Sequence, residues 1–274
     1  MISIKANNLI IKYGDKIAVN KVSLEVNKGE VVTIVGPNGS GKSTLIKAIS
    51  RSIAIDDGEI TLEDINIKEI PTKSIARKVA VLPQVKTISS DITVESLVSY
   101  GRFPHLGFRK RLGKTDNEII QWAMEKTGVL SFRDRNVMTL SGGERQRAWI
   151  SMALAQKPNV LILDEPTTYL DISYQMEVLE LVKELNETLG ITVIMVLHDL
   201  NQAARYSDKI YVLMKGQVCR YGHPKNIMDS ELLRDVFRID ANIYEDKINH
   251  CPYFIPNKIV ETNCHPERSE GSRV

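Results

Sequence analysis

A glycine-rich segment near the start of the chain has the residue types and spacing of a loop that binds phosphate. It reads Gly36-Pro37-Asn38-Gly39-Ser40-Gly41-Lys42-Ser43 and fits the pattern G-x-x-x-x-G-K-[ST] in full. Its glycines let backbone N–H groups surround phosphate oxygens, Lys42 supplies a positive charge, and the Ser43 hydroxyl suits Mg²⁺. We therefore predict a nucleoside triphosphate site at residues 36–43, with Thr44 as a further contact in the helix that follows.

A pair of carboxylates, Asp164 and Glu165, follows directly after an apolar run. On their own, two acids in this position are more often a solvated turn than a site. Beside a phosphate loop they suit a different task, because Asp164 can hold Mg²⁺ and Glu165 can accept a proton from an attacking water molecule. We predict that Asp164 and Ser43 are metal ligands and that Glu165 is the general base.

A second candidate anion site has the sequence Leu140-Ser141-Gly142-Gly143-Glu144-Arg145-Gln146. One interpretation is structural, since Ser141 as a helix N-cap and Glu144 three residues later would form a capping box. The paired glycines favour more than this, because they open a helix N-terminus to close approach by an anion. The chain thus has two predicted helix N-termini that suit a phosphate group, but only one of them is preceded by a loop that carries a lysine.

Short apolar runs must position these groups, and they are rich in Val and Ile without alternating with polar residues. They span Val31–Val35, Val79–Leu82, Val160–Leu163 and Ile191–Leu197. This pattern is typical of strands buried on both faces of a parallel sheet. Helical patterns at Ser43–Arg51 and Gln175–Leu189 alternate with the runs, so the sequence predicts an α/β fold.

Each apolar run ends at a residue that can do chemistry. The residues that follow are, in chain order, the phosphate loop, Gln84, Asp164 with Glu165, and His198. Because ligands of parallel α/β sheets bind beyond the carboxyl ends of the strands, we expect all four groups at one edge of the sheet.

Composition excludes several classes of protein. The formal net charge of the 274 residues is +2, which gives no electrostatic case for a nucleic-acid partner. No apolar stretch approaches the roughly 20 residues of a membrane span, and the N-terminus lacks the apolar core of a secretory signal. Three scattered cysteines, an odd number, argue against a disulfide framework as the basis of the fold. These features predict a cytosolic globular chain.

The run Leu140–Gln146 resembles the signature of ABC-type ATPases, and the resemblance extends from about Ile2 to Pro256. It implies an α/β phosphate-loop NTPase core, with a mostly parallel sheet flanked by helices, antiparallel N-terminal strands and an inserted helical lobe. It also implies ATP and Mg²⁺ as ligands and hydrolysis of ATP. The nucleotide-binding core would occupy about 1–84 and 141–240, and the lobe about 85–140.

The resemblance assigns roles to residues that spacing alone leaves open. It makes Tyr13 the ring that stacks on adenine, Gln84 a residue that touches Mg²⁺ and attacking water, and His198 the histidine at the γ-phosphate. Lys42, Gln84, Glu165 and His198 would then be the catalytic residues. Ser141, Gly142, Gly143 and Glu144 would contact the ATP of a second copy in a head-to-tail dimer, and the loop at Leu170-Asp171 would cross to that copy.

The resemblance also implies partners and a place in the cell. The ATPase would bind separately encoded transmembrane permease subunits at the cytoplasmic face of the membrane and serve, indirectly, an extracytoplasmic substrate-binding protein. The segments Ser99–His105 and Pro166–Asp171 are similar to importers of iron–siderophore, haem and cobalamin. We expect Arg102 and His105 to lie in the part of the lobe that faces the permease.

Other functions remain open at this stage. A soluble ABC ATPase scaffold, as in iron–sulfur cluster assembly, has a similar length. A DNA-repair ATPase is disfavoured, since no long coiled coil separates the phosphate loop from the signature. Residues 257–274 are polar, and we predict a flexible tail there. The dipeptides His250-Cys251 and Cys264-His265 match no familiar zinc spacing, so we do not expect a metal site.

Overall fold

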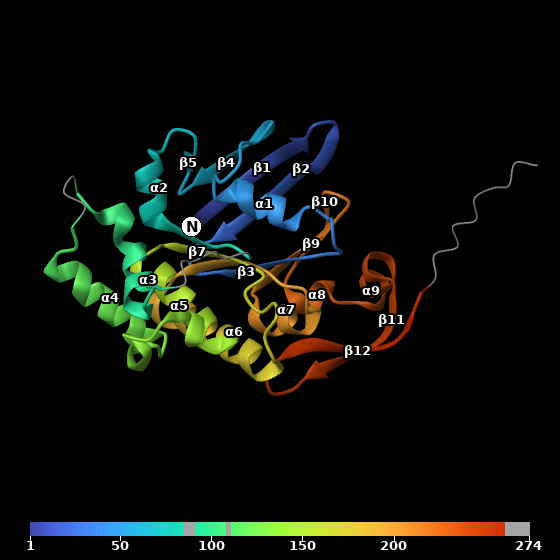
Figure 1. Cartoon of the computed structure of the whole chain (residues 1–274). Helices are drawn as coiled ribbons and strands as arrows, with labels where there is room; N and C mark the ends of the chain where they lie inside the picture. Colours follow the sequence, from blue (N-terminus) through green and yellow to red (C-terminus); the bar gives the residue numbers. More distant parts are fainter. Residues whose placement is uncertain (85–90, 108–110, 261–274) are drawn as a thin grey trace, which may run out of the picture.

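The central layer of the molecule is a six-stranded sheet, seen in a computed structural model that describes residues 1–84, 91–107 and 111–260 (Figure 1). Its strand order is β10-β9-β3-β8-β7-β6, and all neighbours are parallel except the antiparallel pair β9 and β10. The strands are β3 (Val31–Val35), β6 (Val79–Leu82), β7 (Val160–Asp164), β8 (Thr192–Val196), β9 (Lys209–Met214) and β10 (Gln217–Gly222). The predicted α/β class and its four strands are confirmed, while β9 and β10 were not predicted.

Both faces of this sheet are buried, which is why its strands lack alternation. Val31 and Val35 of β3 belong to one hydrophobic cluster, whereas Val32 and Ile34 point into a second cluster on the other face. Every residue of β3, β7 and β8 is buried. Both sides of these strands therefore bury apolar area. Each Å² removed from water stabilises the fold by about 25 cal/mol.

An antiparallel sheet covers one of these faces, as the resemblance implied. Its order is β2-β1-β4-β5, formed by β1 (Ile2–Tyr13), β2 (Lys16–Asn27), β4 (Asp57–Leu62) and β5 (Ile65–Asn66). Helix α1 (Lys42–Ile49) lies between the two sheets in Figure 1 and buries Leu45, Ile46 and Ile49 in the cluster shared by both.

Helices cover the opposite face. They are α5 (Gly142–Ala155), α6 (Ile172–Leu189), α7 (Leu200–Tyr206), α8 (Pro224–Ile227) and α9 (Ser230–Phe237). Helix α2 (Thr72–Lys78) instead packs Ile75 into the cluster on the side of the antiparallel sheet. Helix α6 ends at Gly190 with φ 67°, a left-handed C-cap that glycine adopts without strain. Within the described part of the chain, every helix is too short or too polar to reach across a lipid bilayer.

A helical lobe projects from the core on the left of Figure 1. It contains α3 (Val94–Ser99), the 3₁₀ helix η1 (Tyr100–His105), α4 (Lys114–Lys126), and two further 3₁₀ turns, η2 (Leu130–Phe132) and η3 (Val137–Thr139). Helices α3 and α4 both pack on α5, so the lobe is attached to the helix that begins at the signature segment.

The side chains of Arg102 and His105 hold η1 in place through contacts within the chain, and the expectation that their part of the lobe faces a permease stays a prediction. Arg102 is only 6% exposed; its guanidinium donates to Ala155 O at 2.7 Å and to the Asp116 carboxylate at 2.9 Å. A ring nitrogen of His105 lies 2.8 Å from Gln156 O. Both residues thus tie η1 to the end of α5. The sequence concealed this because a buried arginine and an exposed one look alike in a polar segment.

A C-terminal hairpin, β11 (Ile239–Asp246) and β12 (Cys251–Ile259), was also missed. Asn257 to Ile259 belong to β12, so the predicted start of a flexible tail at 257 falls inside a strand. Residues 261–274 lie outside the described residues, as do Cys264 and His265 of the dipeptide pair. Among the residues that are described, no three His, Cys, Asp or Glu side chains gather as a metal-ligand set.

Arg102→Ala should destabilise the protein, because it leaves Asp116 and the Ala155 carbonyl without their charged donor. Hydrogen bonds from a charged group of this kind typically contribute about 1.5–3 kcal/mol. Urea denaturation monitored by circular dichroism measures the loss. Arg133→Ala is the matched control, because Arg133 pairs with Glu95 on the surface and such pairs add little. Equal effects of the two changes would contradict the clamp.

Candidate active site

The strand order of the central sheet brings the predicted groups to one edge. Strands β3, β8, β7 and β6 are consecutive neighbours and run parallel, so their carboxyl ends coincide. The phosphate loop, His198, Asp164 with Glu165, and Gln84 follow these four strands in that spatial order. The shared edge predicted from the sequence is confirmed.

The backbone of the phosphate loop leaves no room for side chains at two of its glycines. A Cβ atom on Gly36 would lie 2.0 Å from Leu213 O in β9, and one on Gly41 would lie 2.5 Å from Ala18 O in β2. Both residues also have positive φ, 149° and 102°. The loop is therefore packed against both sheets, and Gly41 is the N-cap of α1.

A hollow of about 510 Å³ opens beside this loop. It is lined by Tyr13, Lys16, Ile17, Ala18, Asn38, Gly39, Ser40, Gly41, Lys42, Ser43, Thr44, Glu165, Lys215 and Gly216. Ser40 Oγ is buried and has no hydrogen-bond partner among the described residues, so a phosphate oxygen would satisfy it. The hollow thus contains Tyr13 and all of the predicted ATP-binding residues except Gly36 and Pro37.

Lys42 is turned toward the loop itself. Its ammonium donates to Gly36 O at 2.9 Å and to Pro37 O at 3.1 Å. Burial lowers the pKa of Lys42, and the carboxylates of Glu165 and Asp164 oppose that shift. The same lysine can reach an anion in the hollow, since it lines that space.

Ser43 and Asp164 offer hard oxygen donors for Mg²⁺. The Ser43 hydroxyl donates to Asp164 Oδ1 at 3.4 Å, although the two residues are far apart in the sequence. Burial raises the pKa of Asp164, and the neighbouring Glu165 charge adds to that rise. A divalent cation would relieve this cost of burying a carboxylate, so the residues present fit the metal.

Glu165 is held by three side chains from three segments. Its carboxylate lies 2.6 Å from His198 Nε2, accepts from Gln84 Nε2 at 2.5 Å, and accepts from the Thr168 hydroxyl at 3.1 Å. Its side chain is 8% exposed and its backbone has φ 53°, an uncommon conformation for a residue with a side chain. The structure therefore places Gln84, Glu165 and His198 in direct contact.

Sequence reasoning missed five residues of this region. Thr168 lies three residues after Glu165 in the turn that follows β7, and a threonine there gave no distinct signal. Lys16 and Ala18 of β2 line the hollow, as do Lys215 and Gly216, which form the tight turn between β9 and β10. Gly216 N donates to Ser40 O at 3.0 Å, so this turn supports the phosphate loop. Only a prediction of β9 and β10 would have revealed it.

The signature segment forms the predicted capping box. Ser141 N donates to Glu144 Oε2 at 2.8 Å, and Glu144 N donates to Ser141 Oγ at 3.3 Å. The bond from the Ser141 backbone also lowers the pKa of Glu144. None of these residues lines the hollow at the phosphate loop. The second helix start is thus well formed but separate from the first.

The two signature glycines have different neighbours on the chain. A Cβ on Gly143 would lie 2.3 Å from the Tyr174 ring of α6, while one on Gly142 would lie 3.1 Å from a methyl group of Leu170. Packing against Tyr174 is therefore sufficient reason for glycine at 143. Asp171, the predicted dimer-loop residue, is exposed, and Tyr169 two residues earlier is 98% exposed.

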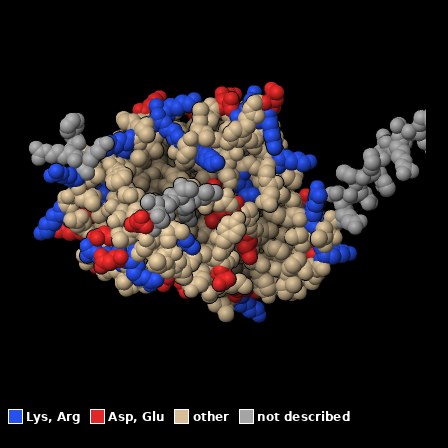
Figure 2. Space-filling model, viewed as in Figure 1, with Lys and Arg blue, Asp and Glu red and all other residues tan. Residues whose placement is uncertain are grey.

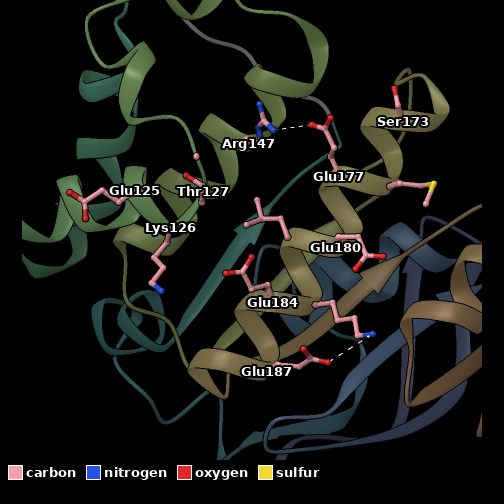
Figure 3. A pocket seen from close by; sticks show the side chains of 13 residues that line it. Glu125, Lys126, Thr127, Arg147, Ser173, Glu177, Glu180, Glu184 and Glu187 are labelled. Carbon is pink, nitrogen blue, oxygen red and sulfur yellow. Dashed lines mark hydrogen bonds and ion pairs between the residues drawn. The ribbon is translucent and has the colours of Figure 1, made fainter. Parts of the chain in front are cut away.

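A larger hollow, of about 920 Å³, lies away from the strand ends, between α4, α5 and α6 (Figure 3). Glu125, Glu177, Glu180, Glu184 and Glu187 line it, against three cationic residues. Arg147 pairs with Glu177 there, as the dashed line in Figure 3 shows. A surplus of carboxylates repels a triphosphate, so the smaller hollow with Lys42 is the nucleotide site. On the face drawn in Figure 2, cationic and acidic side chains are intermixed.

Comparison with known proteins agrees with this site. Residues 19–168 match the family model described as ABC transporter. The chain belongs to the ABC transporter family. It is 43% identical over 256 residues to the petrobactin import ATP-binding protein FpuC of Bacillus anthracis, covering 93% of each chain. It is also 43% identical over 261 residues to the iron(3+)-hydroxamate import ATP-binding protein FhuC of Bacillus subtilis, covering 95% of this chain and 97% of that one.

Among solved structures, an inward-facing metal-chelate type ABC transporter superposes with a TM-score of 0.82 at 25% identity, over 94% of this chain and 98% of that one. Family membership makes this ABC protein an ATP-binding ATPase, as the motifs predicted. The phosphate-loop NTPase fold with its helical lobe is likewise confirmed.

Gly143→Ala should destabilise this ABC protein, because the added methyl group overlaps the Tyr174 ring and α5 or α6 must shift. Overpacking of this kind costs about 1–3 kcal/mol. Gly142→Ala is the matched control, since Leu170 can move its methyl group aside. The free energy of unfolding of both variants, measured in urea, checks the difference. A Gly143→Ala protein as stable as Gly142→Ala would show that Tyr174 does not require the glycine.

Proposed function

We propose that this chain is the ATP-hydrolysing subunit of an importer for iron(III)–siderophore chelates. The observation that carries the proposal is 43% identity to petrobactin and iron(3+)-hydroxamate import ATP-binding proteins over more than nine-tenths of the chain. The chain would act at the cytoplasmic face of the membrane with separate permease subunits and, indirectly, an extracytoplasmic binding protein. These relatives narrow the predicted class from haem, cobalamin or siderophore to siderophore, and they lend no support to a scaffold role in iron–sulfur cluster assembly.

The geometry suggests how the site handles ATP. Backbone N–H groups of residues 36–43 and the Lys42 ammonium would bind the phosphates, and the half-exposed Tyr13 ring at the mouth of the hollow would stack on adenine. Ser43, Asp164 and Gln84 would hold Mg²⁺, which when bound neutralises phosphate charge. Glu165 would take a proton from the attacking water, while His198 orients Glu165 and reaches the γ-phosphate.

A dimer follows from the separation of the two phosphate-seeking helix starts. Ser141, Gly142 and Gly143 do not line the hollow of their own chain, yet Ser141 begins α5 with its first N–H groups available to an anion. We infer that they bind ATP held by the phosphate loop of a second copy, so that two copies pair head to tail. The exposed loop at Tyr169 and Asp171 would then lie between the two copies.

Glu165→Gln should keep ATP binding but lower hydrolysis by roughly 10²–10⁴-fold, because the amide cannot accept the proton. The ATP-bound dimer should accumulate, and uptake of radiolabelled iron–siderophore by cells that carry the whole transporter should stop. Phosphate release, size-exclusion chromatography and uptake measure the three effects. Glu184→Gln, on the outer face of α6, is the control. Near-normal turnover of Glu165→Gln would remove Glu165 from the role of base.

A mixture of Lys42→Ala and Ser141→Arg should recover an ATP-dependent dimer that neither variant forms alone. If each ATP is shared by two copies, the mixed dimer has one site with both lesions and one intact site. Size-exclusion chromatography with a non-hydrolysable ATP analogue, on each variant and on the mixture, measures the recovery. Failure of the mixture to pair, with both variants folded, would contradict a shared site.

A further inference from the structure

The contact between Glu165 and His198 joins two segments that leave different strands. Glu165 follows β7 and leads through a short loop to α6, whereas His198 follows β8 and leads directly to α7. The last register pair of β7 and β8 is Asp164 with Val196, and one further backbone hydrogen bond, from Leu197 N to Ile34 O at 3.4 Å, holds the residue before His198 to β3. The 2.6 Å approach of the two side chains therefore depends on what holds the segments beyond the sheet.

Two glutamines connect these segments beyond the sheet. Gln202 Nε2 in α7 donates to Gln175 Oε1 in α6 at 2.6 Å. Gln175 Nε2 in turn donates to Leu170 O at 2.8 Å, which fixes the end of the loop that begins at Glu165. Figure 1 shows α6 and α7 on the same side of the sheet. The hydrogen bond between Gln175 and Gln202 therefore bridges the first turns of α6 and α7.

Further bonds close the bridge into a ring. Gln202 N donates to Asp199 Oδ1 at 2.9 Å, which caps α7 immediately after His198. At the other end the Thr168 hydroxyl donates to the Glu165 carboxylate. The ring runs from Glu165 through Thr168, Leu170, Gln175, Gln202 and Asp199 to His198 and back to Glu165. A shift of either helix start is therefore opposed by a set of bonds that includes the Glu165–His198 contact.

The amide of Gln202 is not explained by stability. Its Oε1 atom is buried and has no hydrogen-bond partner among the described residues. An unsatisfied buried oxygen is costly, and a leucine of similar size would avoid that cost. The side chain is not among those that line the nucleotide hollow. What the amide does provide is the bond to Gln175.

We propose that Gln175 and Gln202 are positioning residues for ATP hydrolysis, and that their bridge keeps the Glu165 loop and the His198 segment in the arrangement that brings both side chains together. This inference rests on the proposed roles of Glu165 and His198. The bridge acts on the geometry of the reacting groups and leaves the phosphate loop untouched. Its loss should therefore lower kcat for ATP hydrolysis without raising KM for ATP.

Gln202→Leu in the full chain tests the bridge. We expect kcat to fall about tenfold, KM for ATP to stay within about twofold, and the thermal unfolding midpoint not to fall. Because hydrolysis is slower, more ATP-bound dimer should persist in size-exclusion chromatography. Gln121→Leu is the control: Gln121 also donates a side-chain hydrogen bond, to Glu125 at 2.8 Å, but on the surface of α4. An unchanged kcat, or a raised KM with kcat intact, overturns the proposal.

A second set of variants separates the bridge from a general role in folding. Gln175→Glu keeps the acceptor for Gln202 and loses the donor to Leu170, so it should retain more activity than Gln175→Leu. The double variant Gln175→Leu with Gln202→Leu should be no slower than Gln175→Leu alone, because one bond cannot be lost twice. Independent, multiplying losses would contradict a shared bridge.

The Glu165→Gln background distinguishes failure of this inference from failure of the proposed function. In that background Gln202→Leu should change neither residual hydrolysis nor the amount of ATP-bound dimer. If Glu165→Gln is inactive but Gln202→Leu alone has full kcat, the bridge is wrong and the role of Glu165 stands. If Glu165→Gln turns over normally, the proposed role of Glu165 fails first.

Discussion

Parallel pairing of β3, β8, β7 and β6 is the constraint on which the site depends. These strands are buried on both faces, so a slip of one residue in any of them would move apolar side chains between two hydrophobic clusters that are already filled. Register is fixed by packing, and packing thereby fixes where each strand ends. The phosphate loop, His198, Glu165 and Gln84 meet because the two cores fit together in only one way. Chemistry at the edge of the sheet is a consequence of the hydrophobic interior.

The buried carboxylates and the buried lysine at this edge of the sheet lie close to one another. Asp164 and Glu165 are adjacent carboxylates at the end of a buried strand, an arrangement that is unfavourable by itself because burial raises the pKa of Asp164. The Ser43 hydroxyl donates to Asp164, and Lys42 lines the same hollow as Glu165. A lysine whose pKa is lowered by burial and an aspartate whose pKa is raised by burial each favour a ligand that brings the missing charge. A magnesium–triphosphate complex supplies a positive charge for Asp164 and a negative charge for Lys42.

Sequence reasoning reached the parts of this protein that short-range patterns determine. The four central strands, the phosphate loop, the acids after β7 and the capping box at Ser141 are all local signals. It failed where a residue acts through a distant neighbour. It did not reveal the burial of Arg102, because the partners of this side chain, Asp116 and Ala155, lie on α4 and α5. It did not show that Tyr174 of α6 packs against Gly143, a second reason for glycine at that position. Thr168, Gln175 and Gln202 belong to a ring of contacts that only the folded chain assembles.

Helix α5 joins the signature segment to the clamp formed by Arg102 and His105. It begins at Ser141 and ends beside the Arg102 and His105 clamp, and its 14 residues span roughly 21 Å. The clamp ties η1 to the end of α5, so a movement of η1 would be passed along α5 to the signature at its other end. A tilt of about 10° at the clamped end displaces Ser141 by roughly 4 Å over that length. Such a displacement exceeds the length of a hydrogen bond, so it is large enough to make or break a contact between Ser141 and an anion.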